Sequence, residues 1–154
     1  MPEPVEIIWE RHMVNILFVC HGNICRSAMA EFVMKDLAAK AGRSGDFAIA
    51  SAAVSREEIG NPVYPPARRE LEKHGIFCSG HAAHQITAGE YAAVDRVYYM
   101  DESNLRYLKR LLPDTEKCFP LLPHPVADPW YTGDFSTTWR DILEGCEKIL
   151  EEFA

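Results

Sequence analysis

One short run of the sequence brings together a thiol, small polar residues and a guanidinium. The run reads Cys20-His21-Gly22-Asn23-Ile24-Cys25-Arg26-Ser27. A thiolate is a strong nucleophile, and the planar fork of an arginine can hold two oxygens of a phosphate group. Transfer of a phosphoryl group to Cys20 is therefore a chemistry that this run could perform. A cysteine and an arginine at this spacing are weak evidence alone, because short motifs often arise by chance.

The elements on either side of the run strengthen this interpretation. Residues 14–20 form a near-continuous apolar segment, which predicts a central parallel strand covered on both faces. Residues 27–41 are strong helix formers with one apolar stripe, and Gly42 follows as a stop signal. The sequence thus predicts that the run is a tight loop between a strand and a helix.

Such a loop is suited to binding an anion, because backbone N–H groups converge on it and the helix dipole favours negative charge. Gly22 and Asn23 are residues that tolerate the left-handed backbone that this loop needs. The N–H groups and Arg26 would stabilise a negatively charged Cys20 sulfur, and Ser27 could donate its hydroxyl to that sulfur. The alternative is that Cys20 is only a small buried apolar residue at a strand end. The glycine patterns of dinucleotide sites and of nucleotide P-loops are absent from this loop.

Strands and helices alternate along the rest of the chain. The predicted strands are 47–53, 96–100 and 117–122, and the predicted helices are 66–74, 101–112 and 139–153. This alternation predicts an α/β fold with a parallel sheet and a ligand site at the carboxyl ends of its strands. Four prolines between positions 120 and 129 predict an extended loop before the last helix. We interpret residues 13–154 as one domain preceded by an N-terminal extension, residues 1–12.

Composition narrows the class of protein. The chain has 154 residues, 47% of them hydrophobic and 25% charged, which is typical of a globular protein. Its net charge of −7 disfavours binding to nucleic acid or to an anionic membrane surface. No apolar run approaches the roughly 20 residues that cross a bilayer, and the acidic start does not resemble a signal peptide, so we expect a cytoplasmic protein. The five cysteines lack metal-ligand spacing, and so do His21, His81, His84 and His124, for which we expect surface or packing roles. We therefore expect reduced thiols, no metal and no cofactor.

The run from Cys20 to Ser27 resembles the phosphate-binding loop of the low-molecular-weight protein tyrosine phosphatases. Further stretches are similar to the family in the expected order, namely Ser51-Ala52-Ala53, Glu58-Ile59-Gly60-Asn61-Pro62, Lys73-His74-Gly75-Ile76, Met100-Asp101-Glu102-Ser103-Asn104-Leu105 and Asp128-Pro129. The resemblance implies a three-layer α/β sandwich in which helices flank a four-stranded parallel sheet. It also implies a phosphotyrosine-containing protein as substrate, and phosphate or sulfate as ligands of the active site.

The resemblance also implies a role for individual residues. Cys20 matches the nucleophile, Arg26 the phosphate clamp and Asp128 the general acid. The remaining loop residues match the phosphate-binding loop, within which Asn23 braces the loop and Ser27 stabilises the thiolate; Ser51 matches a second bracing position. An aryl oxide leaving group does need a proton from a positioned acid. However, the sequence contains 23 acidic residues, so the choice of Asp128 depends on the resemblance.

Three further features concern the rim of the expected pocket and its redox chemistry. Trp130 and Tyr131 offer flat surfaces for a phosphotyrosine ring, although they could equally be packing anchors. Glu57 occupies a place where many family members carry an aromatic residue, and a carboxylate there could favour basic sequences around the phosphotyrosine. Cys25 could form a protective, reversible disulfide with Cys20, or it could be a buried thiol.

Two other functions remain as alternatives. A thioredoxin-coupled arsenate reductase would share the fold and the anion loop, but it relays oxidation through two further cysteines close together. Cys78, Cys118 and Cys146 are too far apart in sequence to resemble that relay. A noncatalytic reader of phosphate or phosphotyrosine would have no need of a nucleophile and a proton donor. A phosphoarginine or small-molecule substrate also stays open.

Overall fold

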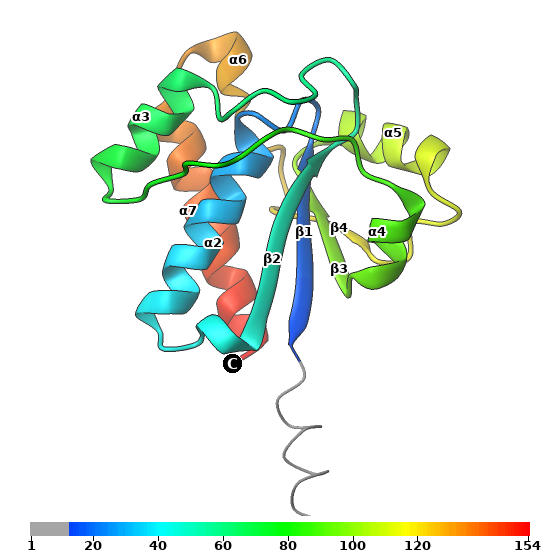
Figure 1. The fold of residues 1–154 in the computed structure, drawn as a ribbon, viewed down its shortest axis with the longest axis horizontal. Helices are drawn as coiled ribbons and strands as arrows, with labels where there is room; N and C mark the ends of the chain where they lie inside the picture. The colour runs from blue at the N-terminus through cyan, green and yellow to red at the C-terminus, as the bar shows by residue number, and fades with distance from the viewer. Residues whose placement is uncertain (1–12) are drawn as a thin grey trace, which may run out of the picture.

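The fold is centred on a parallel β-sheet, which the computed structural model describes together with the rest of residues 13–154 (Figure 1). The expected N-terminal extension, residues 1–12, lies outside the described residues. The strands are β1 (Val14–Cys20), β2 (Phe47–Ala53), β3 (Arg96–Tyr99) and β4 (Cys118–Pro120). All neighbouring pairs are parallel, in the order β2-β1-β3-β4, with Cys20 opposite Ala53 at the end of the β1–β2 register. The predicted four-stranded parallel sheet is confirmed.

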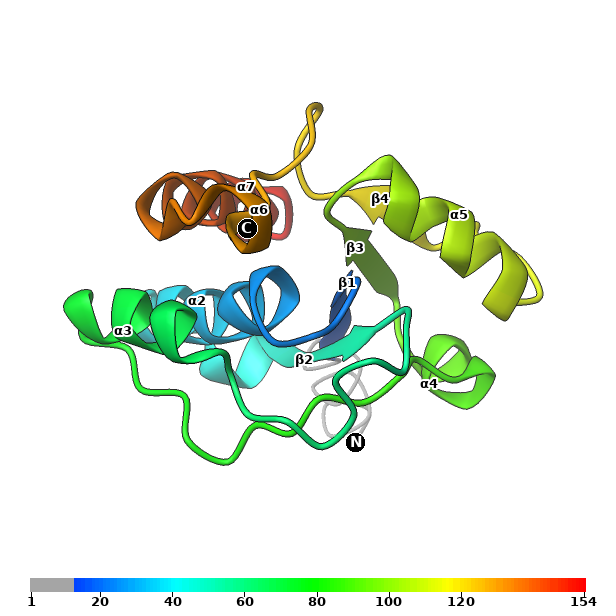
Figure 2. The same ribbon diagram turned by 90° about the horizontal axis from the view of Figure 1, so that it is seen from above.

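Helices cover both faces of this sheet and make a three-layer sandwich (Figure 2). On one face lie α2 (Arg26–Lys40) and α7 (Phe135–Glu152), with α3 (Pro65–Lys73) and α6 (Pro129–Thr132) beside them. On the other face lie α4 (Ala88–Ala93) and α5 (Glu102–Leu111). A single 3₁₀ turn, Ser44–Asp46, connects α2 to β2. Among these described helices, none is long and apolar enough to cross a membrane.

Strand β1 is fixed by burial on both of its faces. Ile16 and Phe18 belong to the core under α2 and α7, whereas Leu17 and Val19 belong to the core under α4 and α5. All four side chains are at most 1% exposed. Full burial of a side chain of this size contributes roughly 1.5–3 kcal/mol relative to leaving it in water. The strand therefore provides a rigid mount for Cys20 at its carboxyl end.

The structure differs from the sequence-based prediction mainly between residues 120 and 134. The extended loop predicted for the proline-rich segment is wrong at Pro129, which begins the short helix α6. Proline suits a first helical position, because its φ is already helical and the N–H it lacks would have no partner there. The Asp128 side chain caps this helix by accepting a hydrogen bond from Trp130 N (3.1 Å). Asp134 likewise caps α7, through Thr137 N (3.0 Å), so this helix begins at Phe135 rather than at the predicted residue 139.

Helix α4 was not predicted at all. It has only six residues, too few for an apolar period to be visible in the sequence. Its start is nevertheless well defined, because Thr87 and Glu90 form a capping box with reciprocal side-chain to backbone hydrogen bonds of 3.0 and 3.1 Å.

A close contact between α7 and the segment after β4 yields a first prediction. A Cβ placed on Gly145 would lie 2.4 Å from Leu121 Cγ, so Gly145→Ala requires the core to shift. We expect this variant to lower the free energy of unfolding by about 1–2 kcal/mol, because overpacking outweighs the gain of about 1 kcal/mol in helix propensity. Chemical denaturation measures the change.

Gly89→Ala is the matched control, because Gly89 also lies in a helix and its added methyl would meet only Thr87 Oγ1, at 3.8 Å. This variant should lose no stability. Equal stabilities of the two variants would show that the contact between α7 and Leu121 is looser than described.

Candidate active site

The phosphate loop, defined here as residues 20–27, connects the end of β1 to the start of α2. Asn23 adopts a left-handed backbone (φ 60°), as the sequence predicted. Gly22 does not, and the expectation that it also supplies a left-handed turn is wrong. A Cβ at position 22 would lie 3.2 Å from Glu58 Cγ, so Gly22 is suited to this position because the neighbouring chain leaves little space.

Cys20 lies at the base of the loop, with its sulfur surrounded by donors. Asn23 N donates to Cys20 Sγ (3.3 Å), and Ser27 Oγ lies 3.0 Å from the same sulfur. Ser27 Oγ also accepts a hydrogen bond from Asn23 Nδ2 (2.9 Å), so its hydroxyl proton can point to the sulfur or to the more distant Ala52 carbonyl oxygen (3.4 Å). The Asn23 N–H stabilises negative charge on Cys20, and the Ser27 hydroxyl does so when its proton points to the sulfur.

A second layer of hydrogen bonds holds the loop from behind. Asn23 Nδ2 also donates to Ser51 Oγ (3.0 Å), Ser51 Oγ donates to Glu31 Oε1 (2.5 Å), and Lys35 Nζ pairs with Glu31 Oε2 (2.6 Å). His81 Nε2 lies 2.7 Å from the Asn23 carbonyl oxygen and contacts the loop from another side. Asn23 is thereby fixed by partners from α2, from β2 and from the segment before α4.

Glu31 and His81 brace the loop, but the sequence did not identify either residue as part of the site. Glu31 stands four positions after Ser27 on α2, so it shares a helix face with that serine, and this spacing was the available signal. His81 was interpreted only as a surface or packing residue, and no sequence signal links it to a loop 58 positions away. Ser51, in contrast, lies where the resemblance implied.

Arg26 is the charged group around which the site is organised. It is 3% exposed; one terminal nitrogen donates to Asp101 Oδ2 (2.9 Å) and to the Val126 carbonyl (3.2 Å), and the other lies 3.3 Å from Asp128 Oδ2. Burial alone would lower the pKa of Arg26, but Cys20, Asp128 and Asp101 outweigh that effect and raise the pKa. The guanidinium therefore stays charged in a buried position.

Asp101 has a second role that the sequence did not reveal. The sequence placed it only at the start of the predicted helix 101–112, where its side chain does cap α5 by accepting a hydrogen bond from Asn104 N (3.0 Å). Burial tends to raise the pKa of Asp101, but the Asn104 amide and Arg26 together lower it below the usual range. The carboxylate is thus held ionised where it orients Arg26.

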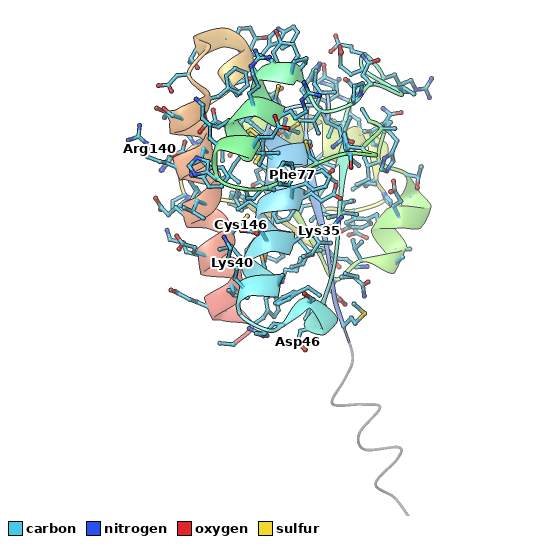
Figure 3. All side chains as sticks on the ribbon, turned by 60° about the vertical axis from the view of Figure 1, so that its left-hand side comes forward. Lys35, Lys40, Asp46, Phe77, Arg140 and Cys146 are labelled. Atoms are coloured by element: carbon cyan, nitrogen blue, oxygen red, sulfur yellow. The ribbon has the colours of Figure 1, made fainter. Side chains whose placement is uncertain are left out.

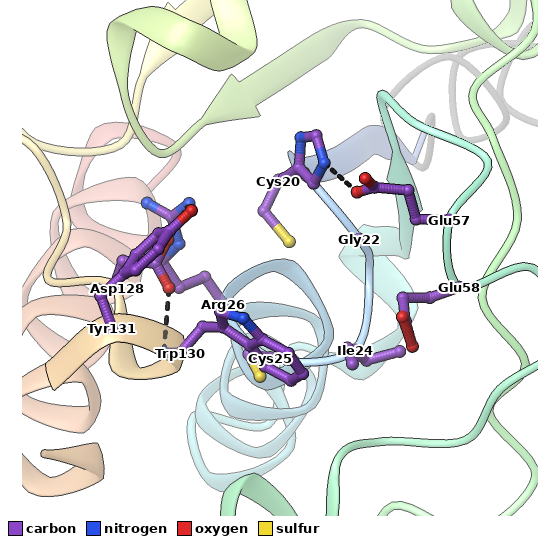
Figure 4. Close-up of a pocket in the computed structure, with 11 residues that line it drawn as sticks. Cys20, Gly22, Ile24, Cys25, Arg26, Glu57, Glu58, Asp128, Trp130 and Tyr131 are labelled. Carbon is purple, nitrogen blue, oxygen red and sulfur yellow. Dashed lines mark hydrogen bonds and ion pairs between the residues drawn. The ribbon is translucent and has the colours of Figure 1, made fainter. Parts of the chain in front are cut away.

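These residues surround one pocket of about 400 Å³ above the phosphate loop (Figure 4). Its lining consists of Cys20, His21, Gly22, Ile24, Cys25, Arg26, Glu57, Glu58, Asp128, Trp130 and Tyr131. Asn23, Ser27 and Ser51 are buried and do not line it; they support the loop from behind. The nucleophile, the clamp and the acid that the resemblance implied are therefore brought together, although Cys20, Arg26 and Asp128 are up to 108 positions apart.

Two aromatic residues of α6 form one wall of the pocket. Trp130 is 56% exposed and packs against Tyr64, with ring centroids 5.1 Å apart. Tyr131 is 85% exposed. Trp130 is accordingly both a packing anchor and a pocket residue, so the two interpretations of this side chain are not exclusive. We call Trp130 and Tyr131 the aromatic wall.

The cysteines differ in their surroundings. Cys25 lines the pocket, and burial, reinforced by the neighbouring Cys20, raises the pKa of its thiol to about 12. Cys78 and Cys118 do not line the pocket. Cys146 is buried where α7 packs on α2, with its sulfur 3.7 Å from the Ala30 carbonyl (Figure 3). Within residues 13–154, no three histidine, cysteine or acidic side chains gather as metal ligands would.

Comparisons with known proteins agree with this geometry. The family model described as low molecular weight phosphotyrosine protein phosphatase matches residues 15–154. The low molecular weight protein-tyrosine-phosphatase YfkJ of Bacillus subtilis is 36% identical over 147 residues, which cover 90% of this chain and 94% of that protein. The human low molecular weight phosphotyrosine protein phosphatase is 36% identical over 155 residues, which cover 93% and 98%.

Solved structures show the same architecture. The crystal structure of YfkJ superimposes with a TM-score of 0.87 at 36% identity, covering 92% of this chain and 94% of that one. The low molecular weight protein tyrosine phosphatase of Streptococcus pyogenes superimposes with a TM-score of 0.86 at 34% identity, with the same coverage. The predicted arrangement of a four-stranded parallel sheet flanked by helices is confirmed by both.

The contrast between the two pocket cysteines gives a prediction. Alkylation requires the thiolate, so near neutral pH iodoacetamide should modify Cys20 at least tenfold faster than Cys25, whose pKa is raised to about 12. Inorganic phosphate should protect Cys20 by occupying the loop. Peptide mapping by mass spectrometry measures both rates, and the buried Cys146 serves as an unreactive internal control. Equal labelling of Cys20 and Cys25, or no protection by phosphate, would contradict this description of the loop.

Proposed function

The chain belongs to the low molecular weight phosphotyrosine protein phosphatase family, and from this premise we propose that it hydrolyses phosphotyrosine in proteins through a phosphocysteine on Cys20. The observation that carries the proposal is that Cys20, Arg26 and Asp128 line one pocket above a loop whose Asn23 N–H donates to the Cys20 sulfur. Each of the three supplies a different requirement of phosphoryl transfer: a nucleophile, a charge clamp and a proton donor.

In the first step, the Cys20 sulfur attacks phosphorus, an S–P bond forms, and the bond from phosphorus to the phenolic oxygen breaks. The nonbridging oxygens carry the developing charge, and Arg26 with the loop N–H groups stabilises it. The Asp128 carboxyl gives its proton to the departing phenolic oxygen. Asp128 Oδ2 lies 3.3 Å from Arg26, so the acid is positioned beside the group that holds the phosphate.

In the second step, a water molecule attacks the phosphocysteine from the side that the phenol has left. Asp128, now a carboxylate, removes a proton from this water, an O–P bond forms and the S–P bond breaks. The sulfur leaves as a thiolate, which Asn23 N and Ser27 Oγ stabilise from 3.3 and 3.0 Å. Inorganic phosphate is released and the enzyme is regenerated without an external cofactor.

The shape of the pocket supports an aryl phosphate over an alkyl phosphate. The side chain of Ile24 and the aromatic wall provide apolar surface above the loop, and a phenyl ring gains from contact with such surfaces. Cys78, Cys118 and Cys146 do not line the pocket, which does not support the disulfide relay of an arsenate reductase. The convergence of a nucleophile and an acid likewise supports catalysis over phosphate binding alone.

Two variants test the mechanism. Cys20→Ser should lower turnover of a phosphotyrosine peptide by at least about 10³-fold while still binding inorganic phosphate, because only the nucleophile is changed. Asp128→Asn should lower kcat by about 10²–10⁴-fold, the usual contribution of general acid catalysis. The loss should be smaller for p-nitrophenyl phosphate, whose leaving group needs less protonation. Normal turnover by Cys20→Ser would refute the phosphocysteine, and consumption of reductant on arsenate by the wild type would favour the reductase.

We also propose that Cys25 protects the nucleophile from irreversible oxidation. Hydrogen peroxide oxidises the Cys20 thiolate to a sulfenic acid. Cys25 then loses its proton and attacks that sulfur as a thiolate, the S–O bond breaks, the departing hydroxide takes up a proton and leaves as water, and a disulfide forms. An external thiol then reduces the disulfide. Burial, which raises the pKa of Cys25 to about 12, keeps this residue a thiol that does not compete for phosphate.

The variant Cys25→Ser tests this protective role. After mild peroxide treatment followed by dithiothreitol, the wild type should recover most of its activity, whereas the variant should recover several-fold less, because its sulfenic acid proceeds to sulfinic acid. Cys118→Ser is the control, since Cys118 is half-buried and does not line the pocket. Equal recovery by Cys25→Ser and the wild type would dismiss the protective role.

A further inference from the structure

The walls of the catalytic pocket differ in chemistry (Figure 4). The aromatic wall, Trp130 and Tyr131, comes from α6 after β4. The segment after β2 contributes two carboxylates to the lining, Glu57 and Glu58, which we call the carboxylate wall. In the close-up, the carboxylate wall and the aromatic wall lie on different sides of the phosphate loop, with Cys20 and Arg26 between them. A side chain that enters the pocket is thus flanked by flat apolar surface and by negative charge.

Both carboxylates are held in place at the rim. The Glu57 side chain is 65% exposed and pairs with His21 of the phosphate loop. Glu58 is less exposed; its Oε1 accepts a hydrogen bond from Asn61 Nδ2 (2.9 Å), and its Cγ lies against Gly22. These contacts fix the side chains without removing them from the pocket lining.

The balance of charge at the rim is negative. Among the residues that line the pocket, Arg26 is the only arginine or lysine, and His21 is the only histidine. Arg26 is buried and already paired with Asp101 and Asp128, and His21 is paired with Glu57. Arg56, which precedes Glu57 and is exposed, does not line the pocket, and its Nε donates to Gln85 Oε1 (3.1 Å). A substrate residue that crosses the rim next to the phosphotyrosine therefore meets two carboxylates that belong to the pocket lining.

We propose that Glu57 and Glu58 make the enzyme prefer phosphotyrosines flanked by basic residues and discriminate against acidic flanks. The inference rests on the proposed function, because it assigns the phosphate to the loop and the ring to the aromatic wall, which leaves the flanking residues of the peptide to pass over the carboxylate wall. A neighbouring lysine or arginine gains attraction there, and a neighbouring aspartate or glutamate is repelled.

The expected effect is moderate, because the rim is open to water. Exposed ion pairs change an equilibrium by factors of roughly 1.4 to 5 each. Two carboxylates acting together should therefore give a ratio of about three- to tenfold in kcat/KM between a basic and an acidic peptide. Because salt screens exposed charges, that ratio should fall when ionic strength rises from about 0.02 M to about 0.3 M.

The experiment compares three phosphotyrosine peptides that differ only in the residues next to the phosphotyrosine, which are lysine, glutamine or glutamate. The ratio of kcat/KM for the lysine and glutamate peptides is measured for the wild type, for Glu57→Gln with Glu58→Gln, and for Glu116→Gln. Glutamine keeps the shape of the side chain and its ability to accept hydrogen bonds. Glu116 is an exposed carboxylate just before the amino end of β4, away from the carboxyl ends where the site lies, so its variant is the matched control.

We expect a ratio of three to ten for the wild type and for Glu116→Gln, and a ratio near one for the double variant. A wild-type ratio near one overturns the proposal, and so does a double variant that keeps the wild-type ratio, since the preference would then arise elsewhere. The glutamine peptide separates this failure from that of the proposed function. If the wild type hydrolyses the glutamine peptide but shows equal kcat/KM for all three peptides, only the proposed specificity is wrong. If it hydrolyses none of the three peptides, the proposed phosphatase activity itself is rejected.

Discussion

Under the proposed function, a chain with a net charge of −7 has to hold a negative sulfur and a phosphate anion at the same point. This constraint is met by local dipoles and one guanidinium, because amide N–H groups at a helix start provide positive potential without net charge. Among the described residues, Arg26 is the only arginine or lysine that is buried. Its desolvation is offset by Asp101, Asp128 and the Val126 carbonyl, each of which also fixes its direction. The site therefore depends on a buried guanidinium that its protein partners already hold in place in the absence of substrate.

The parallel sheet explains how groups so distant in sequence meet around that cation. Each strand leads at its carboxyl end to residues of the site. Strand β1 leads into the phosphate loop, and β3 leads directly to Asp101. Strand β2 carries Ser51 and leads to the carboxylate wall. The segment after β4 passes Val126 and reaches Asp128 and the aromatic wall. Because β1 is clamped between two apolar layers, the position of Cys20 is set by the core rather than by the loop itself.

The sequence predicts those parts of the site whose residues lie close together along the chain. The apolar run of β1, the helix that follows and the phosphate loop between them are each defined by residues within a few positions. Asp101, Glu31 and His81 were not recognised as site residues, because their partners come from other elements and an isolated acidic residue or histidine looks the same whether it is solvated or bonded. The start of α6 is not apparent from the sequence, because Pro129 ends a proline-rich segment typical of an extended loop, although at a first helical position proline favours a helix.

Gly22 lies so close to Glu58 that a Cβ added at position 22 would be 3.2 Å from Glu58 Cγ, and this proximity couples the phosphate loop to its rim. A larger residue at position 22 would fit only with a smaller or displaced neighbour at position 58, so the two sites are not free to vary independently during evolution. Substitutions there are expected to show epistasis, with the effect of one depending on the identity of the other. Under the proposed function, the loop backbone that binds the phosphate and the rim side chain that meets the peptide would therefore evolve together.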